Sequence, residues 1–214
     1  MDARDPAIVG GFWAAVLGLR VEQLADGDVV LRGATPRQTL WINRVPEPKT
    51  VKHRMHFDVR VHSAADLEKL GATVVAVHDH WTIMTDPEGG EFCAFPSDSV
   101  PEYPLFEVVI DAADPQAQAR WWAELLGARA QHDAAHPWWW VEGLPDAPFE
   151  YLVFNAVPES KTVKNRLHID VTADAVEPIV EQGATLVRPE GGDIRWSVLA
   201  DPEGNEFCVF VTRN

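Results

Sequence analysis

Alternating apolar and polar residues predict two strands that each separate a hydrophobic face from a polar one. Residues 55–59 read MHFDV and residues 167–171 read LHIDV. Because successive side chains of a strand point to opposite faces, the apolar residues share one face, which we expect to lie under a helix. The opposite face then presents an imidazole and a carboxylate in both segments: His56 and Asp58, and His168 and Asp170.

A later segment alternates in the same way. Residues 206–210 read EFCVF, so Glu206, Cys208 and Phe210 share one face, and Phe207 and Val209 share the other. We therefore expect His168 and Glu206 to converge on the concave face of a curved sheet, although they are distant along the chain. The corresponding pair earlier in the chain is His56 and Glu91.

Internal repetition explains why these patterns occur in pairs. The chain contains VPEPKTVKHRMHFDV at 45–59 and VPESKTVKNRLHIDV at 157–171. It also contains MTDPEGGEFCAF at 84–95 and LADPEGNEFCVF at 199–210. The order of the segments is kept, which indicates a tandem duplication. We expect two domains, residues 1–99 and residues 104–214, joined by a proline-containing polar linker.

Each half is predicted to be α+β, with two β-α-β-β-β units. In the second half, residues 106–111 predict a strand, and Asp114 as N-cap with Pro115 as first helical residue opens a helix that Gly127 ends. The first half keeps at most a vestige of the opening strand, because its first helix begins almost at Met1. The remaining elements of the second half are strands at 138–141 and 149–154, a strand at 167–171, a helix at 174–182, and strands near 185, at 195–199 and at 206–211.

The composition is that of a globular protein and excludes several partners. Apolar residues make up 46% of the chain, and 33 acidic against 18 basic residues give a net charge of −15. Such a surface repels nucleic acids and anionic membranes. The chain has no apolar run long enough to cross a bilayer, and because its first residues lack a basic region we expect no secretory signal. Two cysteines, Cys93 and Cys208, give no disulfide framework and are interpreted as small buried side chains, so we expect a cytoplasmic protein.

Two motifs, R-x-H-x-D and D-P-E-G-N-E-F-C, resemble those of the vicinal oxygen chelate superfamily (glyoxalase, bleomycin resistance and dioxygenase proteins), most closely its glyoxalase-like domain in duplicated form. Gly90 replaces the Asn of the second motif in the first half. The resemblance implies paired β-α-β-β-β modules that form cup-shaped, mostly antiparallel sheets. It also implies a small-molecule ligand in the cup, with or without a divalent metal that polarises the substrate. The motif residues are Arg54, His56, Asp58, Asp86, Pro87, Gly89, Glu91, Phe92 and Cys93, and in the second half Arg166, His168, Asp170, Asp201, Pro202, Gly204, Asn205, Glu206, Phe207 and Cys208.

The resemblance further implies metal ligands from the first and last strands of each paired unit. In the second half these are His168 and Glu206, with Glu107 as a further candidate; the first half offers the weaker set of His56 and Glu91. Zn, Ni, Mn or Fe would suit such donors, and a protein without cofactor is the alternative. Without metal, His168 and Glu206 would form a general acid/base pair, or would hydrogen-bond each other or the loop.

Tryptophan is abundant, with nine residues. Trp138 and Trp140 are predicted to share one side of a strand, where they either line a cup for a flat hydrophobic ligand or pack against the neighbouring domain. Trp81 and Trp196 are either core or cup wall. The polar ligand-binding candidates are His56, Asp170, Asn155 and the arginines Arg54 and Arg166, which would capture a carboxylate or phosphate or pair with surface carboxylates.

Two functions fit these features. The first is an enzyme, a lyase or isomerase of the glyoxalase-like class, with His168 and Glu206 as catalytic residues. The second is a non-catalytic protein that sequesters a small hydrophobic or aromatic molecule, as bleomycin-resistance proteins do. A third possibility is that the first half only completes the fold of the second. The expected partner is a small molecule, and the chain is expected to be a monomer or a homodimer.

Overall fold

The computed structural model describes residues 1–212. The chain folds into two compact units. Unit 1 comprises Met1–Val109 and Asp146–Leu152, and unit 2 comprises Ile110–Pro145 together with the chain from Val153 onward. The whole first half of the duplication therefore lies in unit 1, which also includes the start of the second half and Asp146–Leu152.

The first module of unit 1 is a four-stranded sheet with one long helix. The strand order is β1-β4-β3-β2, and β1 runs parallel to β4 while the other neighbours are antiparallel. The opening strand of this half is thus two residues long. The elements are β1 (Asp2–Ala3), α1 (Pro6–Leu17), β2 (Arg20–Gln23), β3 (Val29–Arg32) and β4 (Thr39–Arg44).

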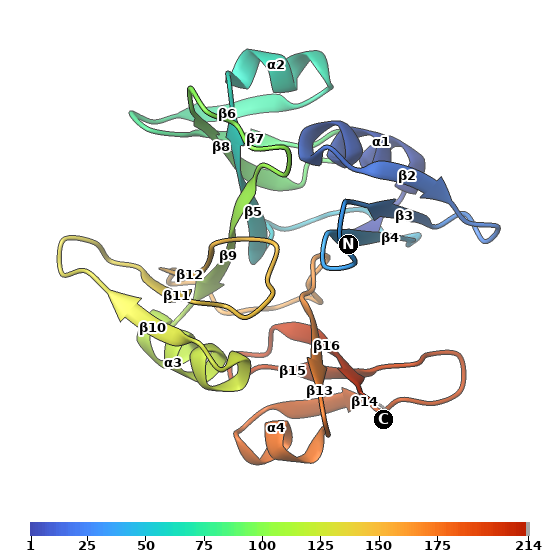
Figure 1. Ribbon diagram of the computed structural model, residues 1–214, viewed down its shortest axis with the longest axis vertical. Coiled ribbons are helices and arrows are strands. Elements are labelled where there is room, and N and C mark those ends of the chain that lie inside the picture. The colour runs from blue at the N-terminus through green and yellow to red at the C-terminus, as the bar shows by residue number, and fades with distance from the viewer. Residues whose placement is uncertain (213–214) are drawn as a thin grey trace. The chain divides into compact units, whose positions relative to one another are not determined.

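The second module of unit 1 has the order β5-β8-β7-β6, with β5 and β8 parallel and the other neighbours antiparallel. The helix α2 packs against β6 and β8 (Figure 1). The first residues of β9 (Leu105–Ala112) lie beside β5, where the Arg60 amide donates to the Pro104 carbonyl over 2.9 Å. The elements are β5 (Met55–Val61), α2 (Ala64–Lys69), β6 (Thr73–Val77), β7 (Thr82–Thr85) and β8 (Glu91–Pro96).

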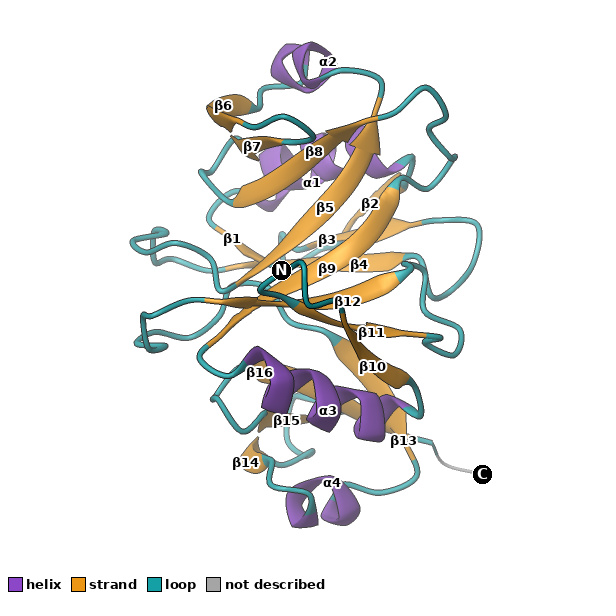
Figure 2. Ribbon diagram, turned by 90° about the vertical axis from the view of Figure 1, so that its left-hand side faces the viewer, coloured by secondary structure: helices purple, strands orange, loops and turns teal. Residues whose placement is uncertain are grey.

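Unit 2 repeats both modules. The last residues of β9 join a sheet of order β9-β12-β11-β10, on which α3 packs against β10 and β11 (Figure 2), and the second sheet has the order β13-β16-β15-β14. The elements are α3 (Pro115–Leu126), β10 (Arg129–His132), β11 (Trp139–Glu142), β12 (Tyr151–Ala156), β13 (Asp170–Ala173), α4 (Glu177–Glu181), β14 (Thr185–Arg188), β15 (Ser197–Ala200) and β16 (Glu206–Val211). The predicted α+β fold of mostly antiparallel modules is confirmed.

The two long helices begin and end as their sequences predict. The Asp114 side chain accepts a hydrogen bond from the Ala117 amide, Pro115 is the first helical residue, and Gly127 ends α3 with φ 63°. In α1, Asp5 caps the start and Gly18 ends the helix with φ 66°. Left-handed backbone at these two ends favours glycine, because a Cβ would clash with the following carbonyl.

A tryptophan at the same place in each helix forms the centre of each core. Trp13 is 2% exposed and Trp122 is fully buried. The Trp13 ring packs edge-on against Phe57 and Phe92 at centroid distances of 5.2 Å, and Trp122 packs against Phe207 at 5.1 Å. Because α1 buries residues around most of its circumference, its sequence is apolar on nearly all sides.

Two predicted elements of the second half are shorter than expected. The strand predicted at 167–171 begins only at Asp170, so His168 precedes β13 instead of lying within it. The helix predicted at 174–182 is limited to Glu177–Glu181. The alternation nevertheless holds in the first half, where Met55, Phe57 and Val59 are buried on one face of β5.

Candidate functional site

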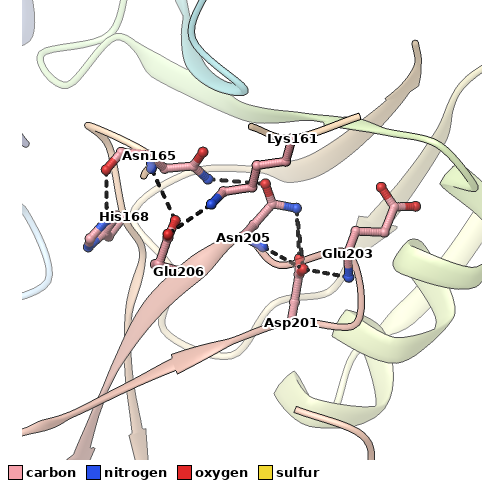
Figure 3. Close-up of polar contacts among 7 residues, drawn as sticks. All are labelled: Lys161, Asn165, His168, Asp201, Glu203, Asn205 and Glu206. Carbon is pink, nitrogen blue, oxygen red and sulfur yellow. Dashed lines mark hydrogen bonds and ion pairs between the residues drawn. The ribbon is translucent and has the colours of Figure 1, made fainter. Parts of the chain in front are cut away.

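His168 and Glu206 both hydrogen-bond the loop that precedes His168 in sequence. The Nε2 atom of His168 lies 2.9 Å from the Asn165 carbonyl, and the Asn165 amide donates to Glu206 Oε2 over 3.1 Å. Lys161 Nζ donates to Glu206 Oε1 over 2.8 Å. The contacts drawn in Figure 3 therefore join both side chains to Asn165. This is the arrangement expected if they hold the loop instead of reacting with a ligand.

In unit 1, Glu91 has partners at the corresponding positions of the first copy. Lys49 Nζ donates to its Oε1 over 2.6 Å, and the His53 amide donates to its Oε2 over 3.0 Å. Burial alone would raise the pKa of Glu91, but the hydrogen bonds from Lys49 and the His53 amide outweigh it and lower the pKa. Each glutamate is thus an ionised anchor for the preceding lysine-containing loop.

The D-P-E-G turns anchor the helices. Asp86 accepts hydrogen bonds from the Trp13 indole over 3.3 Å and from the Gly90 amide over 2.8 Å. Asp201 accepts from the Trp122 indole over 3.2 Å and from the Asn205 amide over 2.8 Å. The glutamate of each turn accepts from two backbone amides just before the helix, Glu88 from Arg4 and Asp5, and Glu203 from Ala113 and Asp114. These motif residues therefore have a structural role.

The residues with the chemistry of a metal site gather in unit 1. His56 Nε2 lies 3.3 Å from Asp58 Oδ1 and 3.7 Å from Cys93 Sγ. One ligand atom of each of the three residues lies within 4.8 Å of the others. The parallel register of β5 and β8 produces this group, because Asp58 lies opposite Cys93 and both point to the face that bears His56.

Glu107 joins this group from β9. Burial, and then the negative charge of Asp58 and a hydrogen bond to it, raise the pKa of Glu107 to about 8. The protonated form of the Glu107 carboxyl is thus favoured by burial and by its contact with Asp58. We name the four residues His56, Asp58, Cys93 and Glu107 the polar cluster.

The donors of the polar cluster suit a divalent metal. Asp58 is 5% exposed, and its Oδ1 atom accepts no hydrogen bond of good geometry, although His56 Nε2 is close to it. A buried carboxylate oxygen without a donor is costly, and a cation would satisfy it. Imidazole, thiolate and carboxylate are the usual ligands of Zn and of similar first-row metals. Burial, and then the charge of Asp58, raise the pKa of the Cys93 thiol, so that metal binding there would release a proton.

Aromatic side chains form a row beside the polar cluster. Trp81 stacks on Phe95 at a centroid distance of 6.0 Å, and Phe95 meets Phe106 edge-on at 5.0 Å. His78 stacks on the other side of Trp81 at 4.7 Å. Phe95 shares a face of β8 with Cys93, two residues away, so the row and the cluster lie on one face of the sheet. We name Trp81, Phe95 and Phe106 the aromatic row.

The corresponding residues of unit 2 are arranged differently. Asp170 lies opposite Cys208 in the parallel register of β13 and β16, and burial followed by the charge of Asp170 raises the pKa of the Cys208 thiol to about 12. Trp196 lies 5.4 Å from Phe210. In the described part of unit 2, however, His168, Asp170 and Cys208 do not form a group that could hold a metal.

The remaining predicted ligand-binding residues lie outside the strands that carry the polar cluster. Trp138 precedes β11 and stacks on His136 at 4.1 Å, while Trp139 stacks on His132 and lies under Arg120 of α3. Trp140 therefore lies on the sheet face away from α3. Asn155 is half-buried on β12, and Arg54 and Arg166 are half-buried in the loops before β5 and β13.

Asp58, Cys93, Arg60 and Phe106 were not among the site residues expected from the sequence. Asp58 and Cys93 could have been found from their parity with His56 and Glu91, but their pairing depends on the parallel register of β5 and β8. Glu107 was expected to complete a site with His168 and Glu206. The structure brings it to Asp58 because β9 lies beside β5.

A family model and solved structures identify this architecture. The model described as a glyoxalase-like domain matches residues 1–95 and 107–210. Glyoxalase I from Zea mays is 12% identical, with a TM-score of 0.70 over 98% of this chain and 89% of that chain. A putative dioxygenase from Bacillus subtilis is 13% identical, with a TM-score of 0.63 over 100% of this chain and 83% of that chain.

The cppA protein from Streptococcus pneumoniae has a TM-score of 0.53 at 11% identity, over 99% of this chain and 96% of that chain. These structures share the fold. No curated protein sequence matches the chain. Among the described residues, no helix is long and apolar enough to cross a membrane. With the family model matched in both halves, the chain belongs to the glyoxalase-like domain family, as a tandem duplication.

Proposed function

We propose that unit 1 binds a small, flat hydrophobic or aromatic organic molecule on the sheet face shared by the polar cluster and the aromatic row. The observation that supports this most directly is the placement of Cys93 and Phe95 on the same face of β8, with Asp58 paired to Cys93. An apolar ring would pack on the row, and a polar end of the molecule would meet the cluster. Binding sites of this kind combine aromatic walls with a few polar groups.

We propose further that this site is enzymatic, with a lyase or isomerase reaction supported by a divalent metal. His56, Asp58 and Cys93 would hold the metal, and Glu107 would complete the set. When bound, the metal supplies Lewis-acid polarisation of a substrate oxygen. The protein supplies the surroundings: the buried Asp58 carboxylate lies 3.3 Å from the His56 imidazole, and the aromatic row would cover one side of a bound molecule.

A non-catalytic binding protein is the second candidate function. The aromatic row supports it, because stacked aromatic side chains bind a flat molecule without any metal. In this case the polar cluster would only hydrogen-bond the ligand, and the protein would act by sequestration.

Metal analysis of matched variants separates the two candidates. The protein is purified without chelator, and metal content is measured by mass spectrometry for the wild type and for His56→Ala and Cys93→Ser. The control variants are their twins in the second copy, His168→Ala and Cys208→Ser. We expect about one Zn, Ni, Mn or Fe per chain, lost in the first pair and kept in the second. Metal lost equally from both pairs contradicts a site in unit 1, and a metal-free protein that binds aromatic ligands is the sequestration protein.

Several properties stay predictions. The limits 1–99 and 104–214 are proposed as the two units of the duplication, while the compact units of the structure divide the chain slightly later. A cytoplasmic location and a monomeric or homodimeric state are likewise proposed. Size-exclusion chromatography with light scattering tests the latter.

A further inference from the structure

Arg60 lies on the face of β5 that bears the polar cluster. It is two residues beyond Asp58 and four beyond His56, so the three side chains share one side of the strand. In the parallel register with β8 it is opposite Phe95 of the aromatic row. The Arg60 cation therefore lies next to Phe95 of the aromatic row.

The Arg60 guanidinium contacts both an aromatic ring and a carboxylate. Its Cζ atom lies 4.6 Å from the centroid of Phe106. Its Nη1 and Nη2 atoms lie 2.5 Å and 3.1 Å from the two oxygens of Glu150. The planar fork thus binds a carboxylate through two parallel hydrogen bonds while it stacks on a ring. This is also the geometry in which an arginine recognises an aromatic carboxylate.

The Glu150 carboxylate binds the Arg60 guanidinium, but both side chains are partly exposed to solvent. The Glu150 side chain is 48% exposed and that of Arg60 is 31% exposed. Because both side chains are partly exposed, water screens the ion pair, and a ligand carboxylate can replace Glu150 at small cost. The Glu150 amide donates to the Phe106 carbonyl over 2.8 Å, so the backbone stays in place when the side chain moves away.

We propose that the ligand class of this site is an aromatic or similarly flat carboxylate, whose anion binds Arg60 in place of Glu150 while its ring packs on the aromatic row. This inference rests on the proposed function. Arg60 is a specificity-determining residue, and Glu150 is an internal competitor that imitates the ligand carboxylate in its absence. Arg60 would offset the negative charge that disfavours anionic ligands elsewhere on a chain of net charge −15.

Calorimetric titration with 2-naphthoate and its neutral amide, 2-naphthamide, tests the proposal. The wild type should bind the carboxylate more tightly than the amide. Arg60→Gln should weaken carboxylate binding by about tenfold, to the level of the amide, because a charge-assisted hydrogen-bond pair is lost. Glu150→Gln should raise the affinity for the carboxylate to about 2–5 times that of the wild type, because the competing side chain loses its charge. The affinity for the amide should not change.

The two charge variants make the failure modes distinct. Equal binding of the two probes, or weaker carboxylate binding by Glu150→Gln, overturns the carboxylate proposal and leaves the aromatic site standing. Failure of both probes to bind any variant overturns the proposed function and this inference together. Arg60→Lys, which keeps the charge but loses the fork, should fall between the wild type and Arg60→Gln. If Arg60→Gln unfolds, Glu150→Gln still tests the proposal, because this variant is expected to bind the carboxylate more tightly than the wild type.

Discussion

At the residue scale, the loops before β5 and β13 show that one substitution is compensated by another. In the second copy, Asn165 Nδ2 donates to Asn205 Oδ1 over 3.1 Å. In the first copy the same two positions hold His53 and Gly90. A Cβ at Gly90 would lie 2.7 Å from Asp86 Oδ2 and 3.0 Å from His53 Cε1, so glycine provides the room that the larger imidazole needs.

This compensation predicts coupling between the two positions. Gly90→Asn alone should lower the free energy of unfolding by about 1–3 kcal/mol, because the new side chain is forced against Asp86 and His53. Combining it with His53→Asn recreates the pair of the second copy and should recover most of the loss. Urea unfolding of the wild type, both single variants and the double variant gives the coupling energy. Additive effects in this cycle would show that the positions do not compensate.

A second prediction concerns Glu206 and pH. Burial opposes the ionised form, but hydrogen bonds from Lys161 and from the Asn165 amide outweigh it and lower the pKa of Glu206 below the ordinary 4.5. A carboxyl whose pKa is lower in the folded state stabilises the fold above its unfolded pKa and loses this contribution as the pH falls through its folded pKa.

Glu206→Gln should therefore be less stable than the wild type by about 1–3 kcal/mol at pH 7, and the difference should shrink below pH about 4.5. Denaturant unfolding at a series of pH values measures it, with Glu181→Gln on the surface as control. A difference that is the same at pH 3 and pH 7 would mean that the Glu206 charge does not contribute.

At the element scale, the helices are defined by their ends and by the turns that hold them. Asp114, Pro115 and Gly127 set the limits of α3, and Glu203 holds the two amides that precede it. The sequence was sufficient for the limits of α3, because capping is a local interaction, whereas the contact with Glu203 joins residues far apart in the chain. It was insufficient for the start of β13, because the length of a strand depends on the partner that lies beside it.

The cap of α3 gives a prediction at this scale. Asp114→Ala removes the side-chain acceptor of the Ala117 amide and should cost about 1 kcal/mol of stability. Asp114→Asn keeps an acceptor and should cost less. Thermal unfolding followed by circular dichroism compares the two variants, and equal losses would show that the cap does not act through this hydrogen bond.

At the scale of the whole molecule, the two copies have diverged in what they bring together. Unit 1 gathers His56, Asp58 and Cys93 within 4.8 Å, whereas the His168 imidazole is held by the Asn165 carbonyl. The sequence favoured the second half as the metal site and gave the first half only the weaker set of His56 and Glu91. We propose instead a division of roles in which unit 1 binds the ligand.

This division predicts that stabilisation by ligands depends on unit 1 alone. When the free metal concentration is 100 times the dissociation constant, metal binding should add about 2.7 kcal/mol to the free energy of unfolding. Added Zn should therefore raise the thermal midpoint of the wild type and of His168→Ala, and should leave that of His56→Ala unchanged. An equal rise in His56→Ala would place the metal elsewhere.

The sequence by itself determined the duplication, the α+β modules, the helix caps and the polar faces of the strands that carry the two motifs. Each of these features depends on residues close together along the chain or on simple alternation. Only the tertiary structure decided which polar residues meet. The pairing of Asp58 with Cys93, the approach of Glu107 and the contact of Arg60 with Glu150 depend on which strand lies beside β5. Strand neighbours are chosen by long-range packing of whole faces, and alternation along one strand is the same whichever neighbour it has.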